Sequence, residues 1–366
     1  MNRPPLEGVK VLDFSMFTPG PFASQILADL GATVLKIERP GIGDLERVSV
    51  PGYFRAYNRG KGSLVLNFRD PADIAVAHNL AKEADIVLDG FRPGVMDRLG
   101  LGFDKLSSLQ PQMIYVSLSG MGSWGPHAQD RGHDSEYMAR VGALGATPRP
   151  DGVPMYDLPM PVSDYAAGMY AVIGILCALK DPEHQAAHIE APCMPAGLAW
   201  MFPRIVMELE DAPGPSAGRT SPGIGCFRTA DGRYVTVTAV EDHVFKALVE
   251  RLGCPELADD PDYASFALRK QHAAAVNAKI AGLVASLDRD ECVRMMEQVG
   301  VPCAPVNTPE EALRDPQVQA LGMLHQQPNL HCDIPLWGLP TRRHVRAPAL
   351  DEHGAAVRAQ GWAALA

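Results

Sequence analysis

Apolar and polar residues alternate through the first third of the chain in a pattern that predicts strands and helices in turn. Apolar residues spaced three and four apart predict helices at 21–30 and 71–83. Because strands that alternate with helices usually form a parallel sheet covered on its faces, we expect a Rossmann-like α/β domain. Short apolar runs bounded by turn residues predict its strands at 9–14, 33–37, 64–68, 86–88, 114–118 and 188–191.

The longest apolar run of the chain, 165–179, is too short to cross a bilayer and predicts a buried helix. Proline and glycine then concentrate at 212–218, which is typical of a linker. We therefore expect a large α/β domain over residues 1–211 and a linker over residues 212–225.

A smaller α+β domain is expected over residues 226–328. Asp231-Gly232 stands between two short runs with strand character, which predicts a hairpin. The remaining segment, 329–366, is rich in proline and arginine, and we expect it to return to the large domain. Helical patterns in the small domain lie at 243–253, 270–287 and 290–299.

The bulk properties narrow the possible classes of protein. A length of 366 residues exceeds what one hydrophobic core usually holds, which agrees with two domains. The formal net charge of -10 argues against a nucleic acid or an anionic membrane as the main partner. The seven cysteines contain no Cys-x-x-Cys pair, so we expect reduced thiols and no metal site. No apolar run of signal-peptide length opens the chain, and we expect a soluble, cytoplasmic protein.

Gly120, Gly122 and Gly125 match the Gly-x-Gly-x-x-Gly pattern of dinucleotide-binding sites and follow an expected strand. That fingerprint needs its third glycine inside a helix whose N-terminus receives the pyrophosphate. Here Pro126 follows at once, and the next residues are polar without an apolar period. We therefore expect a tight loop rather than a nicotinamide or flavin site.

Four cationic residues follow strands, at the sheet edge where open α/β proteins collect ligands. Clustered there, they would hold phosphate groups through charge-assisted hydrogen bonds. The alternative interpretation is that each is a solvated loop charge. The four residues are Arg39, Arg59, Lys61 and Arg92.

An imidazole and a carboxylate stand at the starts of two expected helices, His133 after Gly132 and Asp164 after Ser163. Such a pair can remove a proton from one face of a carbon and return a proton to the other face. The alternative interpretation is that both side chains only cap their helices.

Several segments jointly resemble the class III CoA-transferase superfamily. Within it, Gly132-His133-Asp134-x-x-Tyr137 looks like the α-methylacyl-CoA racemase branch, whereas the segment 41–47 looks more like transferase members. The segments that carry the resemblance are 6–13, 28–40, 58–61, 91–95, 99–102 and 114–120.

The resemblance implies roles for individual residues. His133 and Asp164 would be the two catalytic bases, and Glu241 from the small domain would orient the histidine. The phosphates and adenosine of CoA would lie along the basic residues. The residues that we expect to bind CoA are Arg39, Arg59, Lys61, Arg92 and Tyr137.

We accordingly expect an isomerase, a racemase of 2-methylacyl-CoA thioesters that works through an enolate. It would need no cofactor, since the CoA moiety is part of the substrate. The alternative is a class III CoA-transferase that moves CoA between an acyl-CoA and a carboxylate, with Asp164 as the nucleophile. A third interpretation is a non-catalytic acyl-CoA-binding protein. The resemblance further implies an interlocked homodimer, with each active site formed by the large domain of one chain and the small domain of the other.

Overall fold

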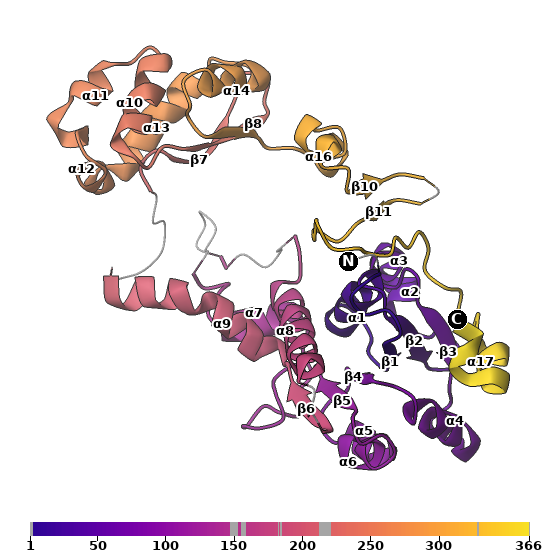
Figure 1. The fold of residues 1–366 in the computed structure, drawn as a ribbon. Coiled ribbons are helices and arrows are strands. Elements are labelled where there is room, and N and C mark those ends of the chain that lie inside the picture. The colour runs from indigo at the N-terminus through magenta and orange to yellow at the C-terminus, as the bar shows by residue number, and fades with distance from the viewer. Residues whose placement is uncertain are drawn as a thin grey trace. The chain divides into compact units, whose positions relative to one another are not determined.

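The computed structural model describes residues 3–146, 153–154, 159–181, 183, 185–211, 221–327 and 329–365. The chain forms two compact units, shown as ribbons in Figure 1. The first unit comprises Met1–Ser216 and Leu321–Ala366, and the second comprises Ala217–Ala320. Of the expected linker, residues 212–220 lie outside the described residues, and Ile224 already begins a strand of the second unit.

A parallel sheet of six strands organises the first unit, in the order β3-β2-β1-β4-β5-β6. This sheet and the separate small sheet of the second unit confirm the expected α/β class. All neighbouring strands run in the same direction. The strands are β1 (Lys10–Asp13), β2 (Thr33–Glu38), β3 (Gly62–Val65), β4 (Ile86–Asp89), β5 (Ile114–Ser117) and β6 (Ala187–Glu190).

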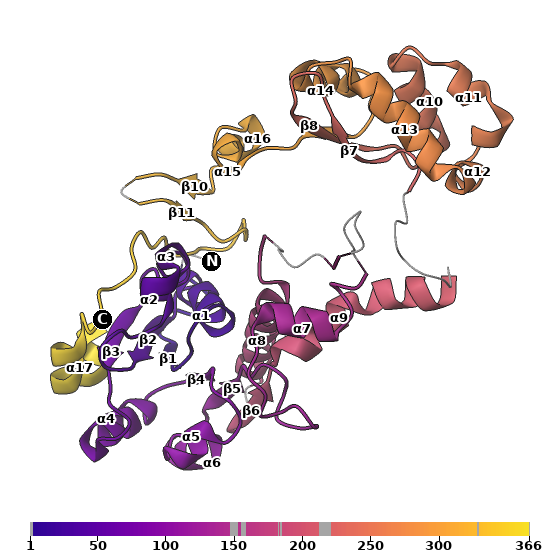
Figure 2. The same ribbon diagram turned by 180° about the vertical axis from the view of Figure 1, so that it is seen from behind.

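The strands read as nearly continuous apolar runs because helices cover both faces of the sheet. Neighbouring residues of one strand enter opposite cores: Val11 packs with α1 (Pro19–Asp29) and α8 (Val162–Lys180), and Leu12 packs with α4 (Pro71–Ala81) on the other side. Figure 2 shows the C-terminal helix α17 (Gly354–Gln360) beside the edge strand β3, where its Val357 joins the second of these cores.

Short helices carry the connections at the carboxyl end of the sheet. Apart from the helix expected after His133, their one or two turns offer too little apolar periodicity to be predicted from the sequence. They are α2 (Glu46–Ser49), α3 (Pro51–Tyr57), α5 (Val95–Arg98), α6 (Phe103–Ser107) and α7 (Asp134–Arg140). The longer α9 (Cys193–Val206) continues into a π-helical turn, Met207–Asp211.

Helix α8 has the length and apolar composition of a membrane span, with a mean hydropathy of 1.6 over its best window. In this protein 44% of that window is buried, against α1, α9 and the sheet among other elements. A core helix of a water-soluble protein passes the same test of composition, so the helix by itself is weak support for a membrane location.

The second unit has a three-stranded antiparallel sheet, in the order β7-β8-β9, packed against helices. The predicted hairpin is formed by β7 (Ile224–Arg228) and β8 (Tyr234–Thr238), and β9 (Cys303–Pro305) pairs with β8. The helices are α10 (Asp242–Arg251), α11 (Glu256–Asp259), α12 (Phe266–Gln271), α13 (Ala273–Val284), α14 (Arg289–Glu297), α15 (Pro309–Ala312) and α16 (Pro316–Leu321).

The segment that follows the second unit packs on the first. A short hairpin, β10 (Leu324–His325) with β11 (His331–Cys332), leads into an extended stretch. Backbone hydrogen bonds then join Arg342 to Asp29 and Arg346 to Gly60, so this stretch lies along α1 and the entry to β3.

Candidate active site

The candidate site lies at the carboxyl edge of the large sheet, where the strand order reverses between β1 and β4. Open α/β sheets bind ligands at such a switch point, because the loops that leave its two central strands diverge. In this protein the two loops are in contact where they leave their strands. A Cβ on Gly90, after β4, would lie 2.9 Å from Cα of Ser15, after β1, so only glycine permits this approach.

Two buried ion pairs lie at this edge of the sheet. Lys61 Nζ lies 3.3 Å from Asp13 Oδ2 and Lys36 Nζ lies 2.9 Å from Asp44 Oδ2, and all four side chains are fully buried. Asp13 also accepts hydrogen bonds from the backbone and hydroxyl of Ser15. Burial alone would raise the pKa of Asp13, but attraction to Lys61 and Lys36 lowers it to about 2. The start of the loop after β1 is therefore fixed by hydrogen bonds from Ser15 to a buried, ion-paired carboxylate.

Glu46, at the start of α2, is a further buried acidic group beside Asp44. Asp44 accepts a hydrogen bond from the Glu46 backbone at 3.1 Å, which brings the two acidic residues together. Glu46 is 4% exposed, and its Oε2 has no hydrogen-bond partner. Burial first, and then repulsion from Asp44, raise the pKa of Glu46 to about 7, and Asp164 adds to this repulsion. Glu46 is therefore a buried carboxyl close enough to Asp164 for the two charges to repel each other.

Asp164 lies in the first turn of α8 and is 9% exposed. Burial, followed by repulsion from Asp134, raises its pKa to about 7, while a hydrogen bond from the Cys193 thiol acts in the opposite direction. The free N–H groups of a helix start favour an ionised carboxylate. Near neutral pH this group therefore exists in both protonation states.

Asp134 and Ser163 connect the two helix starts that carry His133 and Asp164. Asp134 Oδ1 accepts hydrogen bonds from the Ser163 backbone at 2.6 Å and the Ser163 hydroxyl at 2.5 Å, which ties the start of α7 to the start of α8. His133 itself is exposed, and its ring packs edge-on against Phe17 with centroids 5.4 Å apart. The expectation that His133 and Asp164 flank one substrate carbon stays a prediction.

Tyr137 is buried in α7 and does not offer its hydroxyl to solvent. The hydroxyl donates a hydrogen bond to the Gly132 carbonyl at 2.5 Å. A Cβ on Gly120 would lie 2.2 Å from the Tyr137 oxygen. The first glycine of the Gly-x-Gly-x-x-Gly match thus makes room for a tyrosine ring, and the expected contact of Tyr137 with CoA stays a prediction.

The four cations expected at the CoA phosphates fall into two classes. Arg39 and Arg92 are exposed and each donates one hydrogen bond to a loop carbonyl, of Gly43 and Gln129 respectively. Arg59 and Lys61 are buried.

The two buried cations are already engaged within the protein. Arg59 donates to the carbonyls of Ala56, Cys332 and His344. Lys61 donates to Asp13, Pro21, Ser24 and Asn58. Their expected role at CoA stays a prediction, and this burial argues against it, because their donors are used internally.

Glu241 belongs to the second unit. It is exposed and immediately precedes α10, at the N-cap position. Its expected hydrogen bond to His133 joins residues of the two units and stays a prediction.

Aromatic residues that the sequence did not single out stand next to Asp164. The hydroxyls of Tyr165 and Tyr57 share a hydrogen bond, and the Phe22 ring lies 4.8 Å from the Tyr165 ring. Cys193 and Glu46 are further residues that the sequence analysis missed. The only signal for Tyr165 was its place directly after Asp164.

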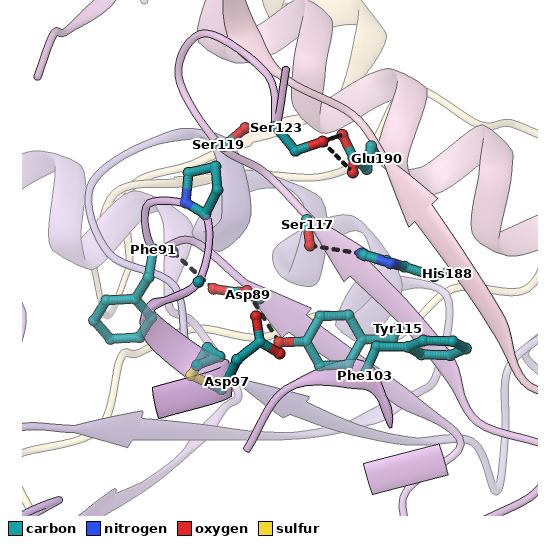
Figure 3. Close-up of a pocket in the computed structure, with 13 residues that line it drawn as sticks. Asp89, Phe91, Asp97, Phe103, Tyr115, Ser117, Ser119, Ser123, His188 and Glu190 are labelled. Atoms are coloured by element: carbon teal, nitrogen blue, oxygen red, sulfur yellow. Dashed lines mark hydrogen bonds between the residues drawn. The ribbon is translucent and has the colours of Figure 1, made fainter. Parts of the chain in front are cut away.

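A separate hollow of about 180 Å³ lies at the ends of β4, β5 and β6 (Figure 3). Asp89 accepts hydrogen bonds there from the Tyr115 hydroxyl and the Phe91 backbone, and burial raises its pKa to about 6. His188 pairs with the Ser117 hydroxyl at 2.9 Å. The described lining residues include carboxylates but no lysine or arginine, so this hollow does not suit phosphate groups.

Comparisons with known proteins agree on one family. The sequence model described as CoA-transferase family III matches residues 6–354. The acetyl-CoA:oxalate CoA-transferase of Acetobacter aceti is 34% identical over 370 residues, which cover 97% of this chain and 95% of that protein. The succinate–glutarate CoA-transferase of Agrobacterium fabrum is 31% identical, with 98% and 96% covered.

A solved structure supports the same conclusion at the level of the fold. The crystal structure of a CAIB/BAIF family protein from Brucella suis superposes with a TM-score of 0.88 at 30% sequence identity. The match covers 98% of this chain and 100% of that chain.

These comparisons correct the expected class of enzyme. The resemblance to the superfamily is confirmed, but the expectation of an isomerase is wrong, because the relatives are named as CoA-transferases. The Gly132-His133-Asp134 motif does not by itself distinguish a racemase from a CoA-transferase. A histidine at a helix start is compatible with more than one chemistry, and here its ring packs on Phe17.

Proposed function

We propose, on the premise that the chain belongs to CoA-transferase family III, that it moves CoA from an acyl-CoA thioester to a carboxylic acid by covalent catalysis at Asp164. The observation that carries the proposal is a buried carboxyl at the start of α8 whose pKa is raised to about 7. A carboxylate that has lost most of its hydration is a stronger nucleophile than one in water.

The reaction divides into two halves. The Asp164 carboxylate attacks the thioester carbonyl, which breaks the C–S bond, releases the CoA thiolate and leaves a mixed anhydride on the enzyme. The thiolate then attacks the Asp164 carbonyl of the anhydride, releases the donor acid and leaves an aspartyl-CoA thioester. In the second half, the acceptor carboxylate attacks the carbonyl of the aspartyl-CoA thioester, which releases the CoA thiolate and forms a new mixed anhydride. The thiolate then attacks the acceptor's carbonyl in this anhydride, so that the new acyl-CoA forms and the Asp164 carboxylate is restored.

The surroundings of Asp164 suit these steps. The Cys193 thiol donates a hydrogen bond to the carboxylate and so holds one orientation of it. Asp134, which is bonded to Ser163, keeps a negative charge beside Asp164 and makes its ionised form more reactive. The exposed Arg39 and Arg92 are the cations that we assign to the CoA phosphates.

We infer that the substrates are small carboxylic acids and their CoA thioesters. The relatives' names include oxalate, glutarate, succinate and D-citramalate, which are all dicarboxylates. A panel of these acids, with acetyl-CoA and succinyl-CoA as donors, is the first set to assay by chromatography of the CoA esters.

We also propose that the protein works as a homodimer. Helices α8 and α9 each expose several large apolar side chains in the single chain, and a concentration of exposed apolar side chains often marks a protein interface. These side chains are Met169, Tyr170, Ile173 and Leu176 in α8 and Leu198, Trp200 and Phe202 in α9.

The covalent step is tested by trapping. Incubation with acyl-CoA and borohydride or hydroxylamine should modify Asp164, and mass spectrometry of the peptide that contains it should locate the adduct. An acceptor acid labelled with ¹⁸O should also place label in Asp164, because the anhydride exchanges an oxygen. Asp164→Asn should lose transfer activity by at least about 1000-fold, as expected when a covalent nucleophile is removed.

Asp70→Asn is the matched control, since Asp70 caps α4 at the surface and asparagine keeps that cap. It should keep full activity. Transfer without label or adduct at Asp164, or an active Asp164→Asn variant, would rule out the covalent route.

A further inference from the structure

The hairpin of β10 and β11 brings two histidines and an aspartate together. His325 and His331 are directly opposite each other in the antiparallel pair, and their rings stack with centroids 4.8 Å apart. Asp333 follows His331 by two residues, a spacing that returns a side chain to the same side of an extended segment. One potential ligand atom from each of the three residues lies within 4.8 Å of the others.

The hydrogen bonds of His331 leave one ring nitrogen ready to bind a cation. Its Nδ1 lies 2.7 Å from the Asn329 carbonyl oxygen, which can only accept, so Nδ1 carries the proton. In the neutral ring Nε2 then holds a free lone pair. Nε2 has no hydrogen-bond partner although the residue is only 5% exposed. Histidines that bind metals are commonly fixed in this way, with the other ring N–H on a carbonyl.

Asp333 supplies the negative charge of the cluster. Its Oδ2 accepts a hydrogen bond from His325 Nε2 at 2.9 Å, and both of its oxygens accept from Arg343. A carboxylate has about four lone-pair sites, so Arg343 can stay in place while Oδ2 gains another partner.

We propose that His325 Nε2, His331 Nε2 and Asp333 Oδ2 bind a divalent transition-metal ion of the zinc type. Two imidazoles and one carboxylate are a ligand set that zinc accepts, with a fourth position left for water. Nitrogen and oxygen ligands of one tetrahedral zinc ion lie roughly 3.4 Å apart, so the 2.9 Å contact of His325 and Asp333 needs to open only slightly.

Binding requires His325 to present a lone pair at Nε2. The Nε2 proton of the neutral ring is lost to water and Nδ1 takes up a proton from water, so His325 binds as its other neutral tautomer, whereas His331 keeps its Nδ1–H on Asn329. The spacing of the cysteines predicted no metal site, and it carries no information on ligands of this kind. The three ligands become neighbours only through the register of this hairpin.

The ion would brace the point at which the chain returns to the first unit. The carbonyl of Cys332, between two of the ligands, accepts a hydrogen bond from Arg59 at 3.1 Å. His331 and Arg59 line one cavity of about 890 Å³ together with residues of α3, through which an ion in water can reach the ligands.

The test uses the full, untagged chain after treatment with a chelator. Titration with Zn²⁺ should show one saturable site per chain by calorimetry and should raise the melting temperature, because the ion binds the folded state. Co²⁺ should give the intense visible absorption of tetrahedral coordination. His325→Ala, His331→Ala and Asp333→Asn should each weaken Zn²⁺ binding at least about 10-fold.

His127→Ala is the matched control, because His127 is an exposed histidine paired with Asp130 at 2.7 Å, outside this cluster. It should bind Zn²⁺ like the unaltered chain. If His331→Ala fails to fold, the more exposed His325 and Asp333 variants decide the outcome. The proposal is overturned if the unaltered chain takes up no Zn²⁺ saturably, or if the His325 and Asp333 variants bind it undiminished.

Discussion

At the scale of single residues, the chemistry of this site depends on charges held close together in a buried place. Asp164, Asp134 and Glu46 are three acidic groups that meet at the starts of helices α8, α7 and α2. The charge of Asp134 raises the pKa of Asp164, and the charge of Asp164 in turn raises the pKa of Glu46. Burial first, and then the charge of Asp134, therefore raise the pKa of the carboxyl that we assign as the nucleophile to about 7.

The pH dependence of transfer should report this environment. Because Asp164 must be ionised to attack and its pKa is raised to about 7, kcat/KM should rise with pH and level off above about 7. Asp134→Asn removes the neighbouring charge but keeps an oxygen for Ser163, so the pKa of Asp164 should fall and the profile should shift to lower pH with it. Initial rates between about pH 5.5 and pH 8.5 give both curves. Identical curves for the two proteins would show that Asp134 does not act on the reactive group.

At the scale of elements, the strands of the large sheet and the helix that carries Asp164 were predictable, whereas the one-turn helix that carries Glu46 was not. Buried parallel strands are apolar throughout, so even a four-residue strand such as β4 is visible in the sequence. A helix of one turn such as α2 has no apolar period that the sequence could show. Glu46, at its start, was therefore not among the expected site residues. The ion pair of Lys61 with Asp13 could not be predicted either, because residues 48 positions apart meet only through the pairing of the strands, and the role of Lys61 at CoA stays a prediction.

The packing of α7 against the loop after β5 can be tested at Gly120. Gly120→Ala places a methyl group 2.2 Å from the Tyr137 oxygen, so the ring must move, and the free energy of unfolding should fall by about 1–3 kcal/mol. Denaturant unfolding measures the change. Gly52→Ala is the control, because no atom lies within 4 Å of its added Cβ and the site is helical, where alanine is favoured. Equal effects of the two substitutions would contradict the packing argument.

At the scale of the whole molecule, the exposed apolar side chains of α8 and α9 are the feature that a single chain does not explain. The sequence predicted α8 as a buried helix, yet Ile173 is 51% exposed and Trp200 in α9 is 50% exposed. Apolar composition indicates that a helix is covered, but it does not say whether the same chain or another chain covers it.

Light scattering after size-exclusion chromatography should therefore show a dimer. Ile173→Asp combined with Trp200→Asp should shift the protein towards monomer, because each places a charge in an apolar interface. Leu268→Asp alters an exposed leucine of α12 in the second unit and should leave the mass unchanged. A monomeric parent protein, or a double variant that remains fully dimeric, would refute the proposal.

The paired charges under the loop after β1 have a consequence for the history of such proteins. Loss of Lys61 alone leaves the buried Asp13 with only Lys36 to balance its charge, at a cost of up to about 3–5 kcal/mol, whereas exchange of both Lys61 and Asp13 for apolar residues of similar volume is milder. Intermediates with one partner replaced are therefore disfavoured, and descendants should either inherit both members or lack both. The same holds for Lys36 with Asp44.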